Sequence, residues 1–152
     1  MYKEYLKGRI GSLIYITATL IKGLSSQTFI ENDFELTPDQ YVILSLLAEN
    51  NKIMYQRQLA EITFKDRANI SKIIEMLRRK GFVEKIPDSN GRRIYKLIVN
   101  EKGKQAKDKA ASTDIALRQI ITKDISEEEL AVTFNTLEKI NINIRDKVKL
   151  QI

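Results

Sequence analysis

The chain has 152 residues, the usual size of one domain, and it contains no cysteine, histidine or tryptophan. The absence of cysteine excludes disulfides, thiolate nucleophiles and cysteine redox switches, and the absence of histidine removes the commonest general base and metal ligand. No glycine-rich phosphate loop or paired-carboxylate motif is evident either. We therefore predict that the protein is not an enzyme and holds neither a metal nor a cofactor.

The net charge of +6 is concentrated in one part of the chain. Residues 65–96 contain ten basic and four acidic side chains, whereas residues 1–36 contain four of each and residues 101–152 contain ten basic and nine acidic ones. A solvated surface would not require such clustering, and a basic segment on a nearly neutral chain favours a polyanionic partner.

The first predicted helix carries apolar residues at helical spacing between Ile10 and Leu24. Its uncharged stretch, residues 10–21, is shorter than the roughly 20 apolar residues that cross a membrane. Glu4 and Lys22 interrupt the pattern of a secretory signal. We expect a cytoplasmic protein without a membrane span.

The next helix is expected to begin at Thr37-Pro38, an N-cap followed by proline at the first helical position, and to end near Glu49. A brief helix follows over about 56–62. Its residues predicted to face the interior are Leu59, Ala60 and Ile62.

A further helix of about fifteen residues is predicted between Asp66, a natural N-cap, and Gly81, which suits the left-handed position after a helix. Apolar residues recur at helical period along one side of it. They are Ile70, Ile73, Ile74 and Leu77. The opposite side is polar and basic.

Two strands are predicted next, over 82–86 and 93–99, because the apolar period changes there from about 3.6 to 2. Asn90-Gly91 between them is the strongest short signal for a β-hairpin turn. In the second strand Tyr95, Leu97 and Val99 are expected to face the interior.

Two capped helices complete the chain. Asn100 is expected to cap a helix that runs to about Lys123, and Ser126 opens the last helix with a capping box. The last helix carries a long apolar stripe consisting of Leu130, Phe134, Leu137, Ile140, Ile144 and Val148. A compact middle region cannot cover the stripes of both chain ends, so we predict a homodimer that uses them.

The order short helix, turn, helix, hairpin indicates a winged helix-turn-helix. The predicted fold is therefore mainly α with a small β-hairpin, in three parts. Residues 1–36 form an N-terminal dimerisation helix, 37–100 the winged helix-turn-helix domain, and 101–152 the C-terminal dimerisation helices.

In such a fold the second helix enters the DNA major groove and the wing reaches along the backbone. Lys72 can reach guanine, Asn69 can pair with adenine, and Ala68 can contact a thymine methyl. The full set of major-groove candidates is Arg67, Ala68, Asn69, Ser71, Lys72 and Glu75. The phosphate candidates are Lys65, Arg78 and Arg79, with Lys80 beside them, and the wing candidates for the minor groove are Asn90, Arg92 and Arg93.

Several ordered motifs resemble the core of MarR-type transcriptional regulators. They are Gln56-x-Gln58-Leu59-Ala60-Glu61, the run from Asp66 to Lys72, Leu77-x-x-Lys80-Gly81-Phe82-Val83-Glu84, the turn from Pro87 to Arg93, and Glu101-Lys102-Gly103. The resemblance implies a dimeric regulator of double-stranded DNA with a pseudo-palindromic operator, usually a repressor released by a small aromatic or anionic ligand. It also places Arg93 at the minor-groove position. Gly91 stands where the family has an acidic residue, which leaves Arg93 without that carboxylate to orient it.

A second hypothesis is a ligand-sensing or protein-interaction module whose DNA binding is weak or lost. The helices of the chain ends and the 37–49 helix could enclose an apolar pocket. Its polar contributors would be Arg9, Tyr15 and Tyr41.

Overall fold

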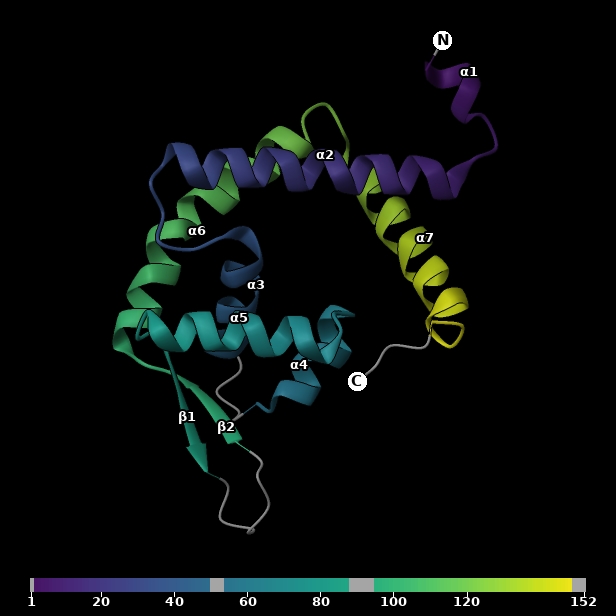
Figure 1. Cartoon of the computed structure of the whole chain (residues 1–152). Coiled ribbons are helices and arrows are strands. Elements are labelled where there is room, and N and C mark those ends of the chain that lie inside the picture. The colour runs from purple at the N-terminus through teal and green to yellow at the C-terminus, as the bar shows by residue number, and fades with distance from the viewer. Residues whose placement is uncertain (1, 50–53, 88–94, 149–152) are drawn as a thin grey trace. The chain divides into compact units, whose positions relative to one another are not determined.

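The computed structural model describes residues 2–49, 54–87 and 95–148 (Figure 1). Most of the predicted elements are present in the predicted order. The helices are α1 (Tyr2–Leu6), α2 (Ile10–Glu31), α3 (Pro38–Glu49), α4 (Gln56–Thr63), α5 (Arg67–Arg79), α6 (Glu101–Ile121) and α7 (Glu127–Arg145), and the strands are β1 (Val83–Pro87) and β2 (Tyr95–Val99). The prediction of a mainly helical protein with one hairpin is confirmed. The predicted wing contacts Asn90, Arg92 and Arg93 lie outside the described residues.

The chain divides into two compact units, residues 1–38 and residues 39–152. The first unit contains α1 and α2. A left-handed Gly8 lies between the two helices, and the short helix α1 was not predicted. After α2 the chain turns so that the Phe29 and Phe34 rings meet edge to face, with 5.2 Å between their centroids.

The second unit is built around the faces of α3, α4 and α5 that the sequence marks as apolar. Its largest completely buried apolar side chains come from all three helices and from the start of β1. They are Ile43, Leu44, Leu59, Ile70, Ile74, Leu77, Phe82 and Val83. Between α4 and α5 the chain turns at Phe64, whose φ is 52°, and Asp66 then caps α5. This pair of helices is the predicted helix-turn-helix.

The hairpin is antiparallel, with register from Val83 opposite Val99 to Pro87 opposite Tyr95. On the other side of β2, Met54 forms an isolated bridge with Leu97, whose N–H donates to the Met54 carbonyl at 3.0 Å. Met54, shortly before α4, thus joins the edge of the sheet. This contact anchors the base of the wing to the helix-turn-helix.

Two predicted interior residues are exposed. Ile62 is 51% exposed because the buried face of α4 is centred between Leu59 and Ala60, about 110° around the helix from Ile62. Tyr95 is 45% exposed because it pairs with Pro87 at the outer end of the hairpin, which extends beyond the helices (Figure 1). The predictions for Leu97 and Val99, at the inner end, are confirmed.

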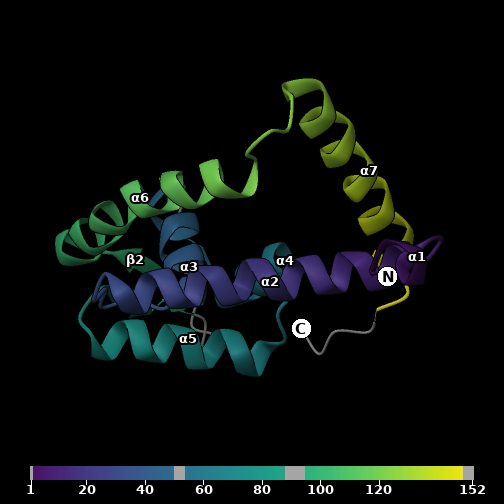
Figure 2. The same cartoon turned by 90° about the horizontal axis from the view of Figure 1, so that it is seen from above.

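The last two helices begin with the predicted caps. Asn100 Oδ1 accepts from Gly103 N–H at 3.0 Å, while Ser126 and Glu129 exchange hydrogen bonds in a capping box. Helix α7 leads away from α6 at an angle (Figures 1 and 2), and none of its described residues is buried. No described helix is long and apolar enough to cross a bilayer.

Candidate nucleic-acid interface

The N-terminus of α5 is held by Asp66. One carboxylate oxygen accepts from Asn69 N–H at 2.8 Å, and the other accepts from the Asn69 side-chain amide at 2.7 Å. The backbone N–H of Asn69 is the main reason that the pKa of Asp66 lies below its ordinary value. Asn69, predicted to pair with adenine, therefore has one amide hydrogen engaged by its own cap, while no other described residue engages its oxygen or its second hydrogen.

Two polar contacts fix α5 and the preceding turn to the neighbouring helices. Ser71 Oγ lies 3.4 Å from Gln56 Oε1 at the start of α4, a weak hydrogen bond. In the turn, the Lys65 ammonium pairs with Asp39 of α3 at 3.1 Å. Ser71 and Lys65, predicted to contact DNA, also hold the helix-turn-helix together.

The outward face of α5 lies opposite its buried isoleucines. Ala68 and Lys72 are exposed there, near the N-terminus, and Arg67 is exposed to one side of them. Among the described residues, Arg67 and Lys72 form no ion pair, so both cations are available to an outside partner. The structure thus brings together the short polar and cationic side chains that base-edge contacts require.

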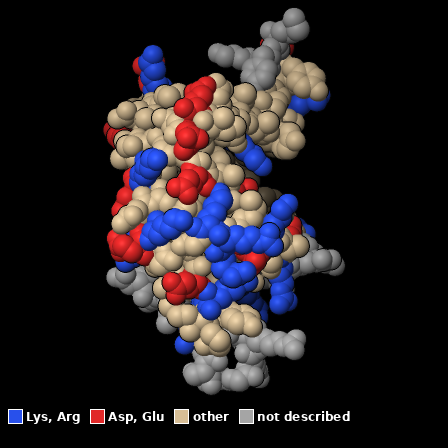
Figure 3. All heavy atoms as spheres, turned by 60° about the vertical axis from the view of Figure 1, so that its left-hand side comes forward, with Lys and Arg blue, Asp and Glu red and all other residues tan. Residues whose placement is uncertain are grey.

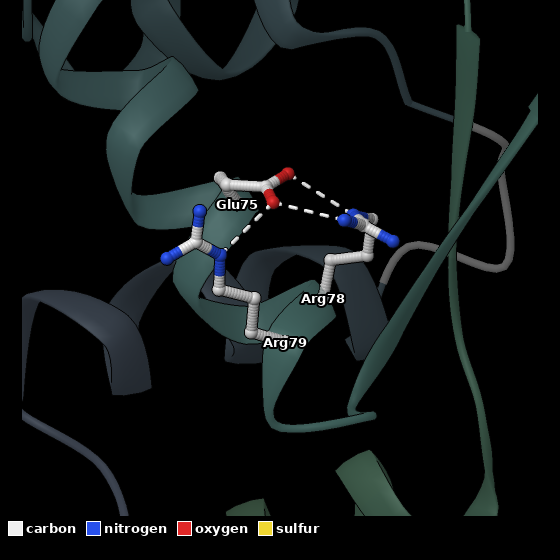
Figure 4. Close-up of polar contacts among 3 residues, drawn as sticks. All are labelled: Glu75, Arg78 and Arg79. Carbon is white, nitrogen blue, oxygen red and sulfur yellow. Dashed lines mark hydrogen bonds and ion pairs between the residues drawn. The ribbon is translucent and has the colours of Figure 1, made fainter.

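One turn further along, Glu75 binds two arginines (Figure 4). Arg78 donates from Nε and a terminal nitrogen to the two carboxylate oxygens, at 3.0 and 2.9 Å, and Arg79 donates from Nε at 3.2 Å. The hydrogen bonds from Arg78, followed by those from Arg79, lower the pKa of Glu75 to about 2. Glu75, predicted as a base contact, is thus the centre of an ionised cluster on the helix surface.

The end of α5 is fastened by contacts that the sequence did not predict. Lys80, considered above as a phosphate contact, donates to the buried amide oxygen of Gln40 at 2.9 Å. Lys102 donates to the Lys80 carbonyl at 2.9 Å, and Asn100 donates to that of Gly81 at 2.8 Å. The burial of Gln40 could have been predicted from the sequence. It lies three, four and seven residues before Ile43, Leu44 and Leu47, which places its side chain on the apolar face of α3.

Basic side chains gather on one face of the second unit. Figure 3 brings forward the side of Figure 1 that carries the end of α5 and the start of α6. On this face Lys and Arg side chains form a cluster with few Asp and Glu side chains among them. Such a surface favours contact with a polyanion.

The three predicted ligand contacts are distributed over both units. The Arg9 guanidinium stacks on the Tyr5 ring, 4.7 Å from its centroid, and Tyr15 is largely exposed. In the second unit Tyr41 is half-buried. Burial and the nearby Asp114 carboxylate raise the pKa of its phenol above the ordinary value. No cluster of acidic residues suited to a metal ion occurs in the part of the chain that the structure describes.

Comparison with known proteins agrees with this architecture. The profile of the MarR family matches residues 34–94, from the residues before α3 to the residue before β2. The HTH-type transcriptional regulator YybA of Bacillus subtilis is 36% identical over 104 residues, which cover 64% of this chain and 69% of YybA.

Solved structures share the fold at lower identity. A cysteine-to-serine mutant of MarR from E. coli, complexed with operator DNA, is 19% identical and superposes with a TM-score of 0.77 over 92% of this chain and 97% of that one. BpsR of Bordetella bronchiseptica, whose DNA binding is regulated by 6-hydroxynicotinic acid, is 19% identical with a TM-score of 0.78 over 87% of this chain and 92% of its own.

Proposed function

This chain belongs to the MarR family of transcriptional regulators, which bind DNA and are not enzymes, and we propose that it represses transcription as a homodimer bound to a pseudo-palindromic operator. The observation that carries the proposal is the outward face of α5. There Ala68 and Lys72 are exposed, with Arg67 exposed beside them, while the opposite face is buried in the core. The E. coli neighbour complexed with operator DNA supports the same use of the fold.

In this proposal each α5 lies in a major groove, and the two grooves are about one helical turn apart. Arg67, Ala68, Asn69, Ser71 and Lys72 face base edges. Lys65, Arg78 and Arg79 contact phosphates, and the wing residues Asn90, Arg92 and Arg93 follow the backbone towards the minor groove. A protein that acts on chromosomal DNA in this way works in the cytoplasm.

Dimerisation is supported by the exposure of apolar side chains at both ends of the chain. Phe134 and Val132 of α7 are 68% and 65% exposed, and Leu20 of α2 is 66% exposed. Apolar side chains that a single chain leaves exposed are a common feature of protein–protein interfaces. Residues 1–36 and 101–152 are therefore proposed to pair with the same segments of a second chain.

A gel-shift assay over several salt concentrations tests DNA binding directly. With labelled duplex from the region upstream of its own gene, we expect a discrete complex whose affinity falls steeply as salt rises, because each phosphate contact releases counterions. Failure to bind any duplex, or binding that ignores salt, would favour the second hypothesis, a ligand or protein module without DNA binding.

Two alanine substitutions separate base contacts from phosphate contacts. Lys72→Ala should reduce the preference for operator over random duplex by about tenfold, since one base contact is worth roughly 1–3 kcal/mol. Arg79→Ala should weaken binding to all duplexes about equally and flatten the salt dependence by about one contact. Competition binding with both duplexes measures each effect. If instead Lys72→Ala weakened binding to all duplexes and Arg79→Ala reduced the preference for the operator, Lys72 would be the phosphate contact and Arg79 the base contact.

We also propose that a small aromatic or anionic effector relieves repression, as the regulation of BpsR by 6-hydroxynicotinic acid suggests. The half-buried Tyr41 phenol is the contact that the second unit offers for such a ligand, with Arg9 and Tyr15 as candidates from the first. A thermal-shift screen with phenolic and pyridine carboxylic acids should show a rise in Tm that Tyr41→Phe reduces. A screen without any rise would remove the support for an effector.

A further inference from the structure

We propose that Glu75 is a positioning residue that sets the DNA specificity of the interface, by holding the guanidinium groups of Arg78 and Arg79 in one orientation on α5. The inference rests on the proposed function. It replaces the predicted base contact of Glu75 with an indirect role through two neighbouring arginines.

The geometry leaves both arginines able to bind phosphate while they are held. Arg78 uses Nε and one terminal nitrogen for Glu75, and Arg79 uses only Nε (Figure 4). One terminal nitrogen of Arg78 and both of Arg79 therefore keep all their hydrogens for other acceptors. Because the carboxylate fixes the planes of both guanidinium groups, these remaining donors point in set directions from the helix surface.

The cluster of Glu75, Arg78 and Arg79 is exposed enough to contact DNA. The side chains of Arg78 and Arg79 are 50% and 75% exposed, and that of Glu75 is 34% exposed. An exposed ion pair contributes little to stability in itself. Its effect is to orient the side chains of Arg78 and Arg79, which would otherwise sample many rotamers.

The other cations on the same helix are arranged differently. Among the described residues, Arg67 and Lys72 at the start of α5 have no carboxylate partner, whereas the two arginines at its end share one. The two cations proposed to meet base edges thus carry no such restraint, whereas the two arginines proposed to meet phosphates are restrained. Restrained arginines contact the phosphates that α5 brings to them in a groove, on any duplex, but they cannot turn to follow phosphates elsewhere.

Loss of the Glu75 carboxylate should therefore increase binding to sequences other than the operator. Without Glu75 the arginines can turn towards phosphates in loosely docked complexes on any duplex, and a negative charge that repels the DNA backbone is lost. Affinity for random duplex should rise more than affinity for the operator. Specificity, the ratio of the two, should fall.

The test compares Glu75→Gln with the wild type on the operator, mapped by footprinting, and on random duplex of equal length. We expect random-duplex affinity to rise about fivefold and operator affinity to change less than about twofold. Glu101→Gln is the matched control, because it removes the same charge from an exposed i, i+3 pair with Lys104 on α6. An unchanged ratio, or an equal fall in the control, would overturn the proposal.

A second measurement does not depend on DNA. In the free protein, the Nε–H resonances of Arg78 and Arg79 in NMR spectra should shift and exchange faster in Glu75→Gln, whereas that of Arg57, paired with Glu61, should not. Unaltered resonances would refute the cluster itself. If the resonances move and the wild type binds no duplex, the proposed function fails and the cluster stands.

Discussion

Replacing Gly103 with alanine should lower the free energy of unfolding by about 2 kcal/mol, since overpacking costs roughly 1–3 kcal/mol and the gain in helix propensity offsets only part of it. A Cβ at this position would lie 2.3 Å from the Phe82 carbonyl oxygen and 2.8 Å from Val99 Cγ1. The same oxygen accepts a hydrogen bond from Asn100 N–H. The backbone at the junction of β1, β2 and α6 would have to move apart.

Thermal and urea denaturation at fixed protein concentration measure this effect. For a chain of this size the expected loss corresponds to a fall in Tm of about 4–8 °C. Gly23→Ala is the control, because a Cβ there meets nothing within 4 Å, and an alanine within a helix should raise stability by about 0.5–1 kcal/mol. Equal changes in the two variants would show that Gly103 is not required for close packing.

If the proposed dimer forms, replacing Phe134 with aspartate should convert it into a monomer and reduce operator affinity by more than about a hundredfold, since a charge buried in an apolar interface costs several kcal/mol. Phe134 lies in the apolar stripe of α7, and no described residue of that helix is buried in the single chain. In the proposed dimer two α5 helices held one turn apart would contribute jointly to binding, whereas a monomer would retain only one.

Light scattering at micromolar concentration gives the mass, and a gel shift gives the affinity. Asn135→Asp is the matched control, since it adds the same charge one residue along, about 100° around the helix from Phe134. It should leave both the mass and the affinity unchanged. A wild-type protein with the mass of one chain would contradict the proposed dimer.

The sequence predicted the helix-turn-helix closely because each of its boundaries carries a local chemical signal. Asp66 and Asn100 cap the helices that they were expected to cap, and Gly81 has the left-handed φ expected after α5. The buried isoleucines of α5 follow its period, so the exposed face with Lys72 was predictable as well. These features depend on residues within a few positions of one another.

Contacts between distant residues were not predictable in this way. The pairing of Lys80 with Gln40 joins positions forty residues apart, and the Met54 bridge to Leu97 joins the sheet to the start of α4. From the sequence alone, the Lys80 side chain is consistent with a solvated surface or with a local cap. Only the packing of α3 against α5 decides which partner Lys80 meets.

The sequence alone determined three features of this protein. They are the concentration of basic residues between positions 65 and 96, the capped helices, and the absence of cysteine and histidine. The tertiary structure decided how those charges are used. It leaves Arg67 and Lys72 exposed, pairs Lys65 with Asp39, and gathers Arg78 and Arg79 around Glu75. The reason is physical: a residue's charge is part of its chemistry, but the partner that orients it depends on which side chains folding brings within hydrogen-bonding distance.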